Sequence, residues 1–212
     1  MNPKKQNYEH LADTIIKNLQ KRQIDGFYFA TAAEAVEKAG SLLTPNATVG
    51  FGGSMTLTES GMMDALNSRK DITLYDRSKA KSPEETKEIY HKALCADFFF
   101  MSTNAITADG ELVNIDGNGN RLAALIYGPE HVIILAGMNK VVRNVDDAIS
   151  RVKNIAAPAN GVRLNTSTPC AITGICHDCF SPSCMCSHTV VTRRCSTPGR
   201  ITVLLIGEEL GY

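Results

Sequence analysis

The sequence lacks three features that would assign the protein to a specialised class. Its 22 Lys and Arg residues balance 22 Asp and Glu residues, whereas proteins that bind nucleic acid or anionic lipid normally carry a basic excess. No apolar run approaches the ~20 residues of a membrane span. The first residues, 1–6, are polar and contain no apolar core of a secretory signal. We therefore expect a cytoplasmic protein that neither binds nucleic acid nor inserts into a membrane.

The composition is otherwise that of an ordinary soluble domain. The chain has 212 residues, of which 43% are hydrophobic and 21% are charged, enough apolar material for a substantial core. We interpret residues 1–212 as a single domain.

Short apolar runs alternate along the chain with helical patterns. Runs typical of strands occur at residues 27–29, 48–51, 72–75, 97–101 and 131–136, and a last one follows at 200–206. Strands that alternate with helices of ten to fifteen residues require crossover connections. The pattern therefore predicts an α/β fold with a mainly parallel sheet and helices on both of its faces.

Local signals set the expected helix starts and one hairpin. Residues 31–34 and 56–59 have the form of capping boxes, and the second should open a helix to about residue 68. Ser82 and Pro83 mark another start, and a further helix is expected over 145–155. The Asp109-Gly110 pair between two apolar runs predicts a hairpin with a type I′ turn.

The cysteines are the one unusual feature of the composition. Six of the seven lie between Cys170 and Cys195, in a segment of about residues 158–199 that interrupts the strand–helix pattern. A loop of roughly forty residues without secondary structure is uncommon in a compact domain unless something holds it. A four-thiolate metal site can contribute ~10–16 kcal/mol toward ordering such a segment. In a reducing cytosol the pattern therefore predicts a cysteine-rich, metal-binding insertion.

Four cysteines form the best candidate ligand set. Cys176 and Cys179 have the C-x2-C spacing that brings two thiolates to one ion. Cys170 and Cys186 complete the set, because Cys184 would point away from Cys186 in an extended segment. Soft thiolates select zinc or an iron–sulfur cluster, and spacing does not separate the two. The alternative is a group of free or redox-active thiols.

The remaining possible ligands have ordinary interpretations. Cys195 is a spare thiol, and Cys95 is expected in a helix as a small buried residue. His177 and His188 could replace a cysteine ligand but are more typical of solvated neighbours of a metal site.

The first glycine-rich loop follows the strand at 48–51. Gly52, Gly53 and Ser54 precede a helix, so backbone N–H groups could approach an anion there. Glu59 could either cap this helix together with Thr56 or reach a ligand over the loop.

Two further loops are expected at the same edge of the sheet. One groups an acid, amides and a cation around two glycines: Asp116, Gly117, Asn118, Gly119, Asn120 and Arg121. An Asp-Gly turn needs no ligand, but this density of polar groups is more typical of a site for an anionic or polyhydroxyl molecule. The other loop contains Asn139 and Lys140. Lys140 is a candidate contact for phosphate or carboxylate, although a solvated lysine is the commoner case.

The order of these motifs resembles that of the lactate-utilisation (LUD) domain family. The resemblance covers the chain from about Lys5 to Gly207. It rests on Gly52-Gly53-Ser54, on the run from Asp97 to Thr107, on Asp116-Gly117 through Asn120-Arg121, and on Gly137 to Lys140. It implies a Rossmann-like, mostly parallel sheet similar to the fold of ribose-5-phosphate isomerase, CoA transferases and 5-formyltetrahydrofolate cyclo-ligase.

The resemblance also implies a function. Members of the family are associated with the oxidation of L-lactate to pyruvate, in systems whose partner proteins carry Fe–S clusters. The cysteine segment resembles that of a variant in which Cys170, Cys176, Cys179 and Cys186 form a short motif. This sequence has Cys184 where an arginine is usual.

We therefore predict an Fe–S component in the oxidation of L-lactate or a related 2-hydroxy acid, with a [4Fe–4S] cluster on the four cysteines. Glu59 or Asp116 would be the acid/base group. The small anionic substrate would be held by Gly52, Gly53, Ser54, Asn104 and Arg121, with Gly117, Gly119, Asn120, Asn139 and Lys140 in the same loops. Flavin or Fe–S proteins are the expected partners, and the chain could form a homodimer.

Two alternatives stay open at this point. One is a non-redox enzyme that acts on a sugar phosphate, CoA ester or folate and uses zinc only to order the cysteine segment. The other is a metal-sensing or assembly module without catalysis. Fold kinship alone does not decide between chemistries.

Overall fold

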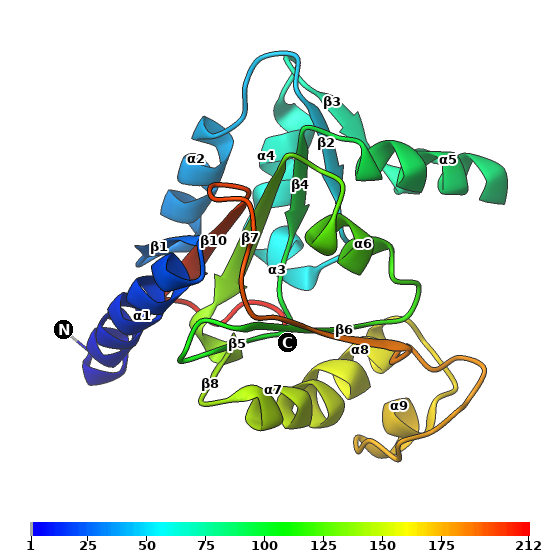
Figure 1. Cartoon of the computed structure of the whole chain (residues 1–212). Coiled ribbons are helices and arrows are strands. Elements are labelled where there is room, and N and C mark those ends of the chain that lie inside the picture. Colours follow the sequence, from blue (N-terminus) through cyan, green and yellow to red (C-terminus); the bar gives the residue numbers. More distant parts are fainter. Residues whose placement is uncertain (1) are drawn as a thin grey trace.

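The computed structural model describes residues 2–212 and contains two sheets (Figure 1). The larger sheet has six strands, all parallel, in the order β1-β10-β7-β4-β2-β3. Their bounds are β1 Asp25–Phe29, β2 Thr48–Phe51, β3 Thr73–Tyr75, β4 Phe98–Met101, β7 His131–Gly137 and β10 Ile201–Ile206. The predicted α/β class with a mainly parallel sheet is confirmed.

Helices cover both faces of this sheet and create two apolar cores. On one face lie α1 (Pro3–Lys21), α5 (Pro83–Leu94) and α6 (Asn120–Ile126). On the other face lie α2 (Ala32–Ser41), α3 (Met55–Glu59) and α4 (Met62–Ser68). Successive strand residues serve opposite cores, so Phe99 packs in the first and Phe100 in the second. This two-sided burial explains why the central strands are unbroken apolar runs.

The second, smaller sheet adjoins the carboxyl ends of the main strands. Its order is β8-β5-β6-β9, with bounds β5 Ala105–Thr107, β6 Leu112–Asp116, β8 Val141–Val142 and β9 His188–Thr192. Short connections from β4 to β5 and from β7 to β8 hold it there. The helices α7 (Val145–Arg151) and α8 (Ala157–Arg163) lie beside it (Figure 1).

The helix predicted over 145–155 is longer than expected. After α7 it continues through one π-helical stretch, Val152–Ala156, into α8. Such π-helical stretches occur frequently at functional sites because they shift the side chains that follow. No helix within residues 2–212 is both long enough and apolar enough to cross a membrane.

The local helix signals are correct at two starts and wrong at a third. Thr31 forms the predicted capping box, and Ser82 caps α5 as expected. The capping box at Thr56 is wrong, because α3 begins one residue earlier and the Thr56 hydroxyl is buried and donates to the Leu210 carbonyl at 3.1 Å. The single helix expected to residue 68 breaks at Gly61, whose φ is +81°.

The hairpin between β5 and β6 forms, but its predicted type I′ turn is wrong. Gly110 has a φ of +87°, whereas Asp109 is not in the left-handed region that this turn also requires there. The carbonyls of the turn face α1 instead. Asn18 Nδ2 donates to the Ala108 carbonyl at 3.1 Å and Arg22 Nε donates to the Asp109 carbonyl at 2.7 Å.

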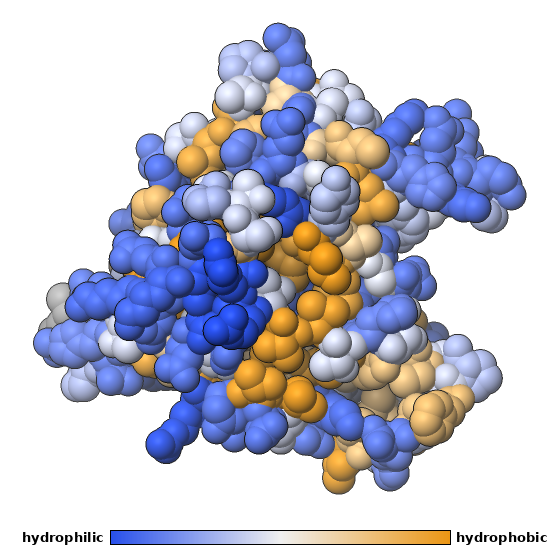
Figure 2. Space-filling view, viewed as in Figure 1, coloured by the Kyte–Doolittle hydropathy of each residue, from blue (hydrophilic) through white to orange (hydrophobic). Residues whose placement is uncertain are grey.

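The cysteine-rich segment 158–199 contains more regular structure than the sequence predicted. It includes most of α8, the short helix α9 (Pro169–Thr173) and β9. The β-branched run 189–192 pairs with the open edge of β6, which explains the added strand. Nevertheless, none of the residues 169–194 is buried. Figure 2 shows hydrophobic surface at the lower right, where Figure 1 places α9 and the loop that follows it.

The two cysteines outside the candidate ligand set have opposite environments. Cys195 is buried, and its Sγ donates to the Thr197 carbonyl at 3.1 Å. Cys95 is exposed, so the expectation of a buried residue is wrong. Because α5 ends at Leu94, Cys95 lies after the last helical turn and not on the face that packs against the sheet.

Candidate functional site

A cavity of about 360 Å³ lies at the carboxyl edge of the main sheet. Its walls come from the loops after β2, β4 and β6, from the turn after β7, from the π-helical stretch, and from residues 211–212. Open α/β sheets bind ligands at this edge. The volume is at the lower end of the range for small-molecule sites.

The cavity brings together nine of the sixteen residues to which the sequence assigned a role. Those that were assigned a role as acid/base group, substrate contact or metal ligand are Gly53, Ser54, Asn104, Asp116, Gly117, Asn120, Arg121, Lys140 and Cys186, and Asn118 of the second loop lines the cavity as well. The other candidates lie outside its lining: Gly52, Glu59, Gly119, Asn139, Cys170, Cys176 and Cys179. The three loops therefore meet at one edge of the sheet, as expected. The role of each side chain depends on its own contacts.

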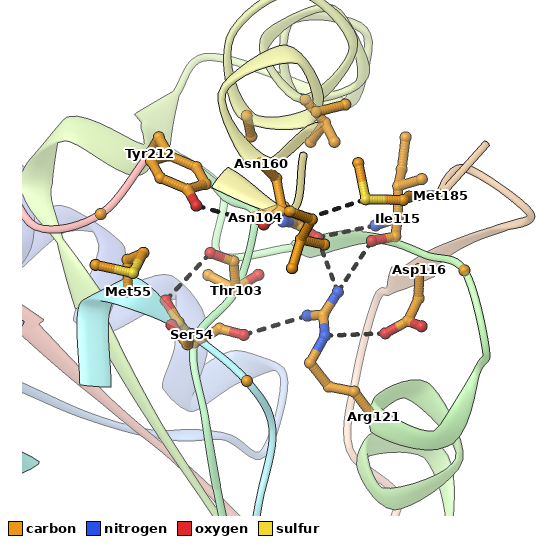
Figure 3. Close-up of a pocket in the computed structure, with 18 of the residues that line it drawn as sticks. Ser54, Met55, Thr103, Asn104, Ile115, Asp116, Arg121, Asn160, Met185 and Tyr212 are labelled. Carbon is orange, nitrogen blue, oxygen red and sulfur yellow. Dashed lines mark hydrogen bonds and ion pairs between the residues drawn. The ribbon is translucent and has the colours of Figure 1, made fainter. Parts of the chain in front are cut away.

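Arg121 is the centre of a hydrogen-bond network in the cavity wall (Figure 3). Its N–H groups donate to Asp116 Oδ2 (3.0 Å), Asn114 Oδ1 (2.5 Å), Asn104 Oδ1 (3.0 Å) and the carbonyls of Ser102 (3.3 Å) and Ile115 (3.0 Å). A guanidinium has five N–H donors, so the protein itself engages all of them. Arg121 thus joins the loop after β4 to β6.

Asp116 is similarly engaged through both carboxylate oxygens. Oδ1 accepts from the Gly119 N–H at 2.9 Å, and Oδ2 accepts from Arg121. Gly119 has a φ of +81°, and a Cβ placed on it would lie 3.3 Å from the His188 ring. The Asp-Gly loop is therefore ordered by its own carboxylate and packs against the first residue of β9.

The first glycine loop makes room for two arginines. A Cβ on Gly52 would lie 3.1 Å from Arg121 Cδ, and one on Gly53 would clash with Arg77 Nη2. Both glycines therefore allow a long cationic side chain to lie against the backbone beside the cavity.

Glu59 and Asn139 hold the segment that closes one side of the cavity. Glu59 Oε2 accepts from the Gly211 N–H at 2.6 Å. Asn139 Oδ1 accepts from the Leu210 N–H at 3.2 Å, and its Nδ2 donates to the Gly211 carbonyl at 3.2 Å. These contacts place Gly211 and Tyr212 in the lining.

Lys140 is the least expected member of the site, because its side chain is only 3% exposed. Its Nζ donates to Thr56 Oγ1 at 2.7 Å and to Ser102 Oγ at 3.1 Å. Burial, followed by the nearby charges of Arg151 and Arg121, lowers the pKa of Lys140 to about 7, while Glu59 opposes this shift. A large fraction of Lys140 is therefore neutral at physiological pH.

Sequence reasoning missed Arg77, which also lines the cavity. It belongs to the 3-10 turn Arg77–Lys79 after β3, and its guanidinium carbon lies 5.7 Å from the centre of the Tyr90 ring. Within the part of the chain that the structure describes, its side chain makes no hydrogen bond or ion pair. The signal for it was present, since a cation that follows a predicted parallel strand must lie at the same sheet edge as the glycine loops.

The cysteine-rich segment reaches the cavity through Met185 and Cys186. The Ser187 N–H donates to the Asp116 carbonyl at 3.1 Å, and Asn160 Nδ2 lies 3.3 Å from Met185 Sδ. Asn160 Oδ1 also accepts from the Tyr212 hydroxyl at 3.3 Å (Figure 3). The segment therefore forms one wall of the candidate site.

Several thiols gather around Cys186. Partial burial and the proximity of Cys184, Cys176 and Cys170 raise the pKa of the Cys186 thiol to about 12. Cys184, which the sequence argument placed on the far side, is thus among the thiols that act on Cys186. Cys179 is not among those groups.

The donor chemistry of this group fits a zinc ion or an iron–sulfur cluster. Cys176 Sγ accepts a hydrogen bond from the Asp178 N–H at 3.4 Å, and Cys170 Sγ lies 3.4 Å from the Thr168 hydroxyl. Among residues 2–212, however, no three His, Cys, Asp or Glu side chains are already arranged to hold an ion. Closure around a metal requires the exposed segment to shift.

The parallel sheet with a cavity at its carboxyl edge defines a Rossmann-like α/β domain. More particularly, the chain matches the model of the LUD domain over residues 12–206 and belongs to that family. No curated protein matches it.

Among solved structures, the chain is similar to a DUF162 family protein from Deinococcus radiodurans, with a TM-score of 0.52 and 12% identity over 94% of this chain and 98% of that one. It is more distantly similar to eIF2B delta from Chaetomium thermophilum, with a TM-score of 0.38 and 17% identity over 66% and 54% of the two chains. The tetrameric eIF2B-beta2-delta2 complex from C. thermophilum gives a TM-score of 0.46 and 18% identity over 82% and 55%. At these identities the first similarity shows the fold alone.

Proposed function

We propose that this lactate-utilisation-type protein binds L-lactate or a related 2-hydroxy acid in the cavity and carries a [4Fe–4S] cluster on the adjacent cysteines. The observation that carries the proposal is that Cys186 lines the same cavity as Arg77, Arg121 and Lys140. A redox centre and the molecule it oxidises must be close together, and these residues combine soft sulfur ligands with cations in one site. Membership of the LUD domain family supports the proposal.

Arg77 and Arg121 differ in whether their N–H groups are already engaged by the protein. The N–H groups of Arg121 are engaged by the protein, whereas the Arg77 side chain has no hydrogen-bond partner within the described residues. Arg77 is therefore the group best able to pair with a substrate carboxylate. Lys140, with Thr56 and Ser102, offers hydrogen bonds to the hydroxyl group.

Three of the proposed cluster ligands are Cys170, Cys176 and Cys186. Cys179 is the fourth ligand expected from the sequence, and Cys184 is the alternative for that fourth position. A cluster held there would supply one-electron transfer. Flavin or Fe–S proteins would then exchange electrons with this chain, and a homodimer is a further arrangement to test.

The metal content of protein purified without oxygen tests this side of the proposal. Iron and sulfide in stoichiometric amounts, with broad visible absorbance, are expected. Cys186→Ser should lose the iron, whereas Cys95→Ser, which changes the exposed thiol that follows α5, should retain it. One zinc per chain without iron would instead indicate the alternative, a non-redox enzyme on a sugar phosphate, CoA ester or folate with a structural zinc site. If neither iron nor zinc is found, both the Fe–S proposal and the structural-zinc alternative would be contradicted.

Ligand binding tests the substrate side separately. NMR spectra recorded during titration with L-lactate should show binding to the wild-type protein. Arg77→Ala should weaken this binding by roughly tenfold, since a hydrogen bond to a charged group contributes about 1.5–3 kcal/mol. Arg143→Ala is the matched control, because Arg143 is an exposed arginine outside the cavity lining. Equal losses in the two variants would contradict the assignment.

A further inference from the structure

Lys140 differs from a lysine that only binds an anion. It is the one lysine among the described residues that line the cavity, and its amine lies between two hydroxyl groups. No carboxylate within residues 2–212 forms an ion pair with it. An anion-binding lysine is normally exposed and charged, whereas this one is buried where the neutral amine is favoured.

Two aspects of the surroundings place this amine beside the cavity. Lys140 belongs to a 3-10 turn immediately after β7, so its backbone position is set by the central strand of the sheet. Lys140 nevertheless lines the cavity, and its Nζ contacts Thr56 and Ser102, which line it too. A neutral amine held at the wall of a polar cavity is a nucleophile toward carbonyl carbon.

We propose that the Lys140 amine forms an imine with the carbonyl group of a small 2-oxo acid bound in the cavity. The inference deepens the proposed function and rests on it, because a 2-oxo acid is the oxidised form of a 2-hydroxy acid. It assigns to Lys140 covalent capture of the carbonyl compound, with Arg77 as the partner of the carboxylate.

The reaction needs no oxidant or reductant. The nitrogen lone pair attacks the carbonyl carbon, and the carbonyl oxygen takes up a proton as the C–N bond forms. The nitrogen then loses its two protons, the new hydroxyl group takes up a second proton, and the C–O bond breaks with release of water. The net change is amine plus carbonyl to imine plus water. The hydroxyls of Thr56 and Ser102, both in contact with Nζ, can relay these protons.

The charges around Nζ favour the neutral amine that this reaction requires. Arg151, the last residue of α7, and Arg121, in α6, both disfavour a positive charge on Lys140, and Glu59 of α3 is the group that favours it. Thr56 and Ser102 are neutral. The rate of imine formation should therefore rise as pH increases through about 7 and then level off. Exposed lysines, with an ordinary pKa near ~10.4, should react faster still at higher pH.

Reductive trapping tests the proposal directly. The full-length protein is incubated at neutral pH with sodium pyruvate and sodium cyanoborohydride, which reduces an imine to a stable secondary amine. Peptide mass spectrometry should locate one reduced pyruvate adduct on Lys140, well above the labelling of exposed lysines such as Lys79. Sodium L-lactate, which has no carbonyl group, should give no adduct. Labelling spread equally over the exposed lysines would overturn the proposal.

Two variants keep the test independent of folding problems. Lys140→Met removes the amine at nearly the same side-chain length and should remove the dominant adduct. Arg77→Ala leaves Lys140 intact and should reduce its adduct by roughly tenfold at low pyruvate concentration, because the carboxylate loses its charged partner. Unchanged labelling of Lys140 in Arg77→Ala would overturn the assigned role of Arg77.

NMR titrations with pyruvate and L-lactate separate failure of this inference from failure of the proposed function. Binding of either acid without a Lys140 adduct would overturn imine formation and leave the proposed binding site standing. If neither acid binds, both proposals fall. An adduct on Lys140 whose rate levels off near pH 7 supports the inference, whereas a rate that keeps rising to pH 10, as for exposed lysines, contradicts it.

Discussion

The six-stranded sheet and the cysteine-rich segment are stabilised in different ways. Every residue of β10 is buried, whereas none of the residues 169–194 is. The sheet gains its stability from apolar burial on two faces. The segment leaves Ile172, Ile175 and Phe180 exposed and makes mostly polar contacts. A chain that orders such a segment needs another source of free energy, and thiolate–metal bonds are the source that its composition offers.

The two regions meet at the cavity, so the difference in their stability affects the candidate site. Lys140 follows β7 of the six-stranded sheet, while the segment contributes Met185 and Cys186. Ligand-binding elements are often drawn from the less stable parts of a protein. We therefore expect local opening of the segment to change the site while the sheet stays folded.

The largest expected difference between the regions is in the free energy of unfolding when one phenylalanine in each is replaced by alanine. Phe100→Ala should lower the free energy of unfolding by about 3–5 kcal/mol, because Phe100 is completely buried. Phe180→Ala should change it by less than about 0.5 kcal/mol, because Phe180 is fully exposed. Denaturant titrations followed by circular dichroism measure both values. A large loss in Phe180→Ala would mean that the segment folds as part of the core.

The second prediction concerns the buried charge at the sheet edge. The folded-state pKa of Lys140, about 7, is below the unfolded value, so above pH 7 the unfolded chain binds more protons than the folded one. Stability should therefore rise with pH between about 7 and 10, by at most about 1.4 kcal/mol per pH unit. Below pH 7 the amine is protonated in both states, so the loss of stability caused by burying its charge should stay at its full value.

Lys140→Met serves as the control for that pH dependence. Its unfolding free energy, measured by denaturant titration at several pH values, should lack this part of the slope because it has no amine to titrate. Equal slopes in the wild-type protein and the variant would show that Lys140 titrates normally in the folded state.

A smaller effect is expected where the two regions touch. Gly119→Ala should lower stability by about 1–2 kcal/mol, since it places a side chain at a φ of +81° and 3.3 Å from His188. Gly174→Ala has a similar φ, +78°, but nothing within 4 Å of the added Cβ, and it lies in the exposed segment. Thermal unfolding should show the smaller change for Gly174→Ala. Identical changes would mean that the contact with β9 contributes nothing.

The smallest effect on the sheet should follow metal removal. After chelation, limited proteolysis should cleave within residues 170–187, because the polar contacts of that segment are too few to order it alone. The unfolding midpoint of the sheet, followed by circular dichroism, should stay nearly constant. Simultaneous loss of the sheet and the segment would show that the two regions are one cooperative unit.

Much of the fold was predictable from local patterns. The apolar runs of β4, β7 and β10 and the capping box at Thr31 depend on residues close in sequence, and each was located correctly. The failures at Thr56 and Asp109 share one cause. In both cases a contact with a distant residue took the hydrogen-bonding group that the local pattern would have used. Leu210 takes the Thr56 hydroxyl, and Asn18 takes the Ala108 carbonyl, which a type I′ turn around Asp109 would have used.

The sequence by itself determined which segments form strands, which loops reach the carboxyl edge and which thiols are available, because these follow from side-chain periodicity and chain connectivity. The tertiary structure alone decided that Arg121 is engaged by the protein, that Arg77 is free within the described residues and that Lys140 is buried beside two hydroxyls. Burial and pKa depend on which distant segments pack together, and no local pattern encodes that packing.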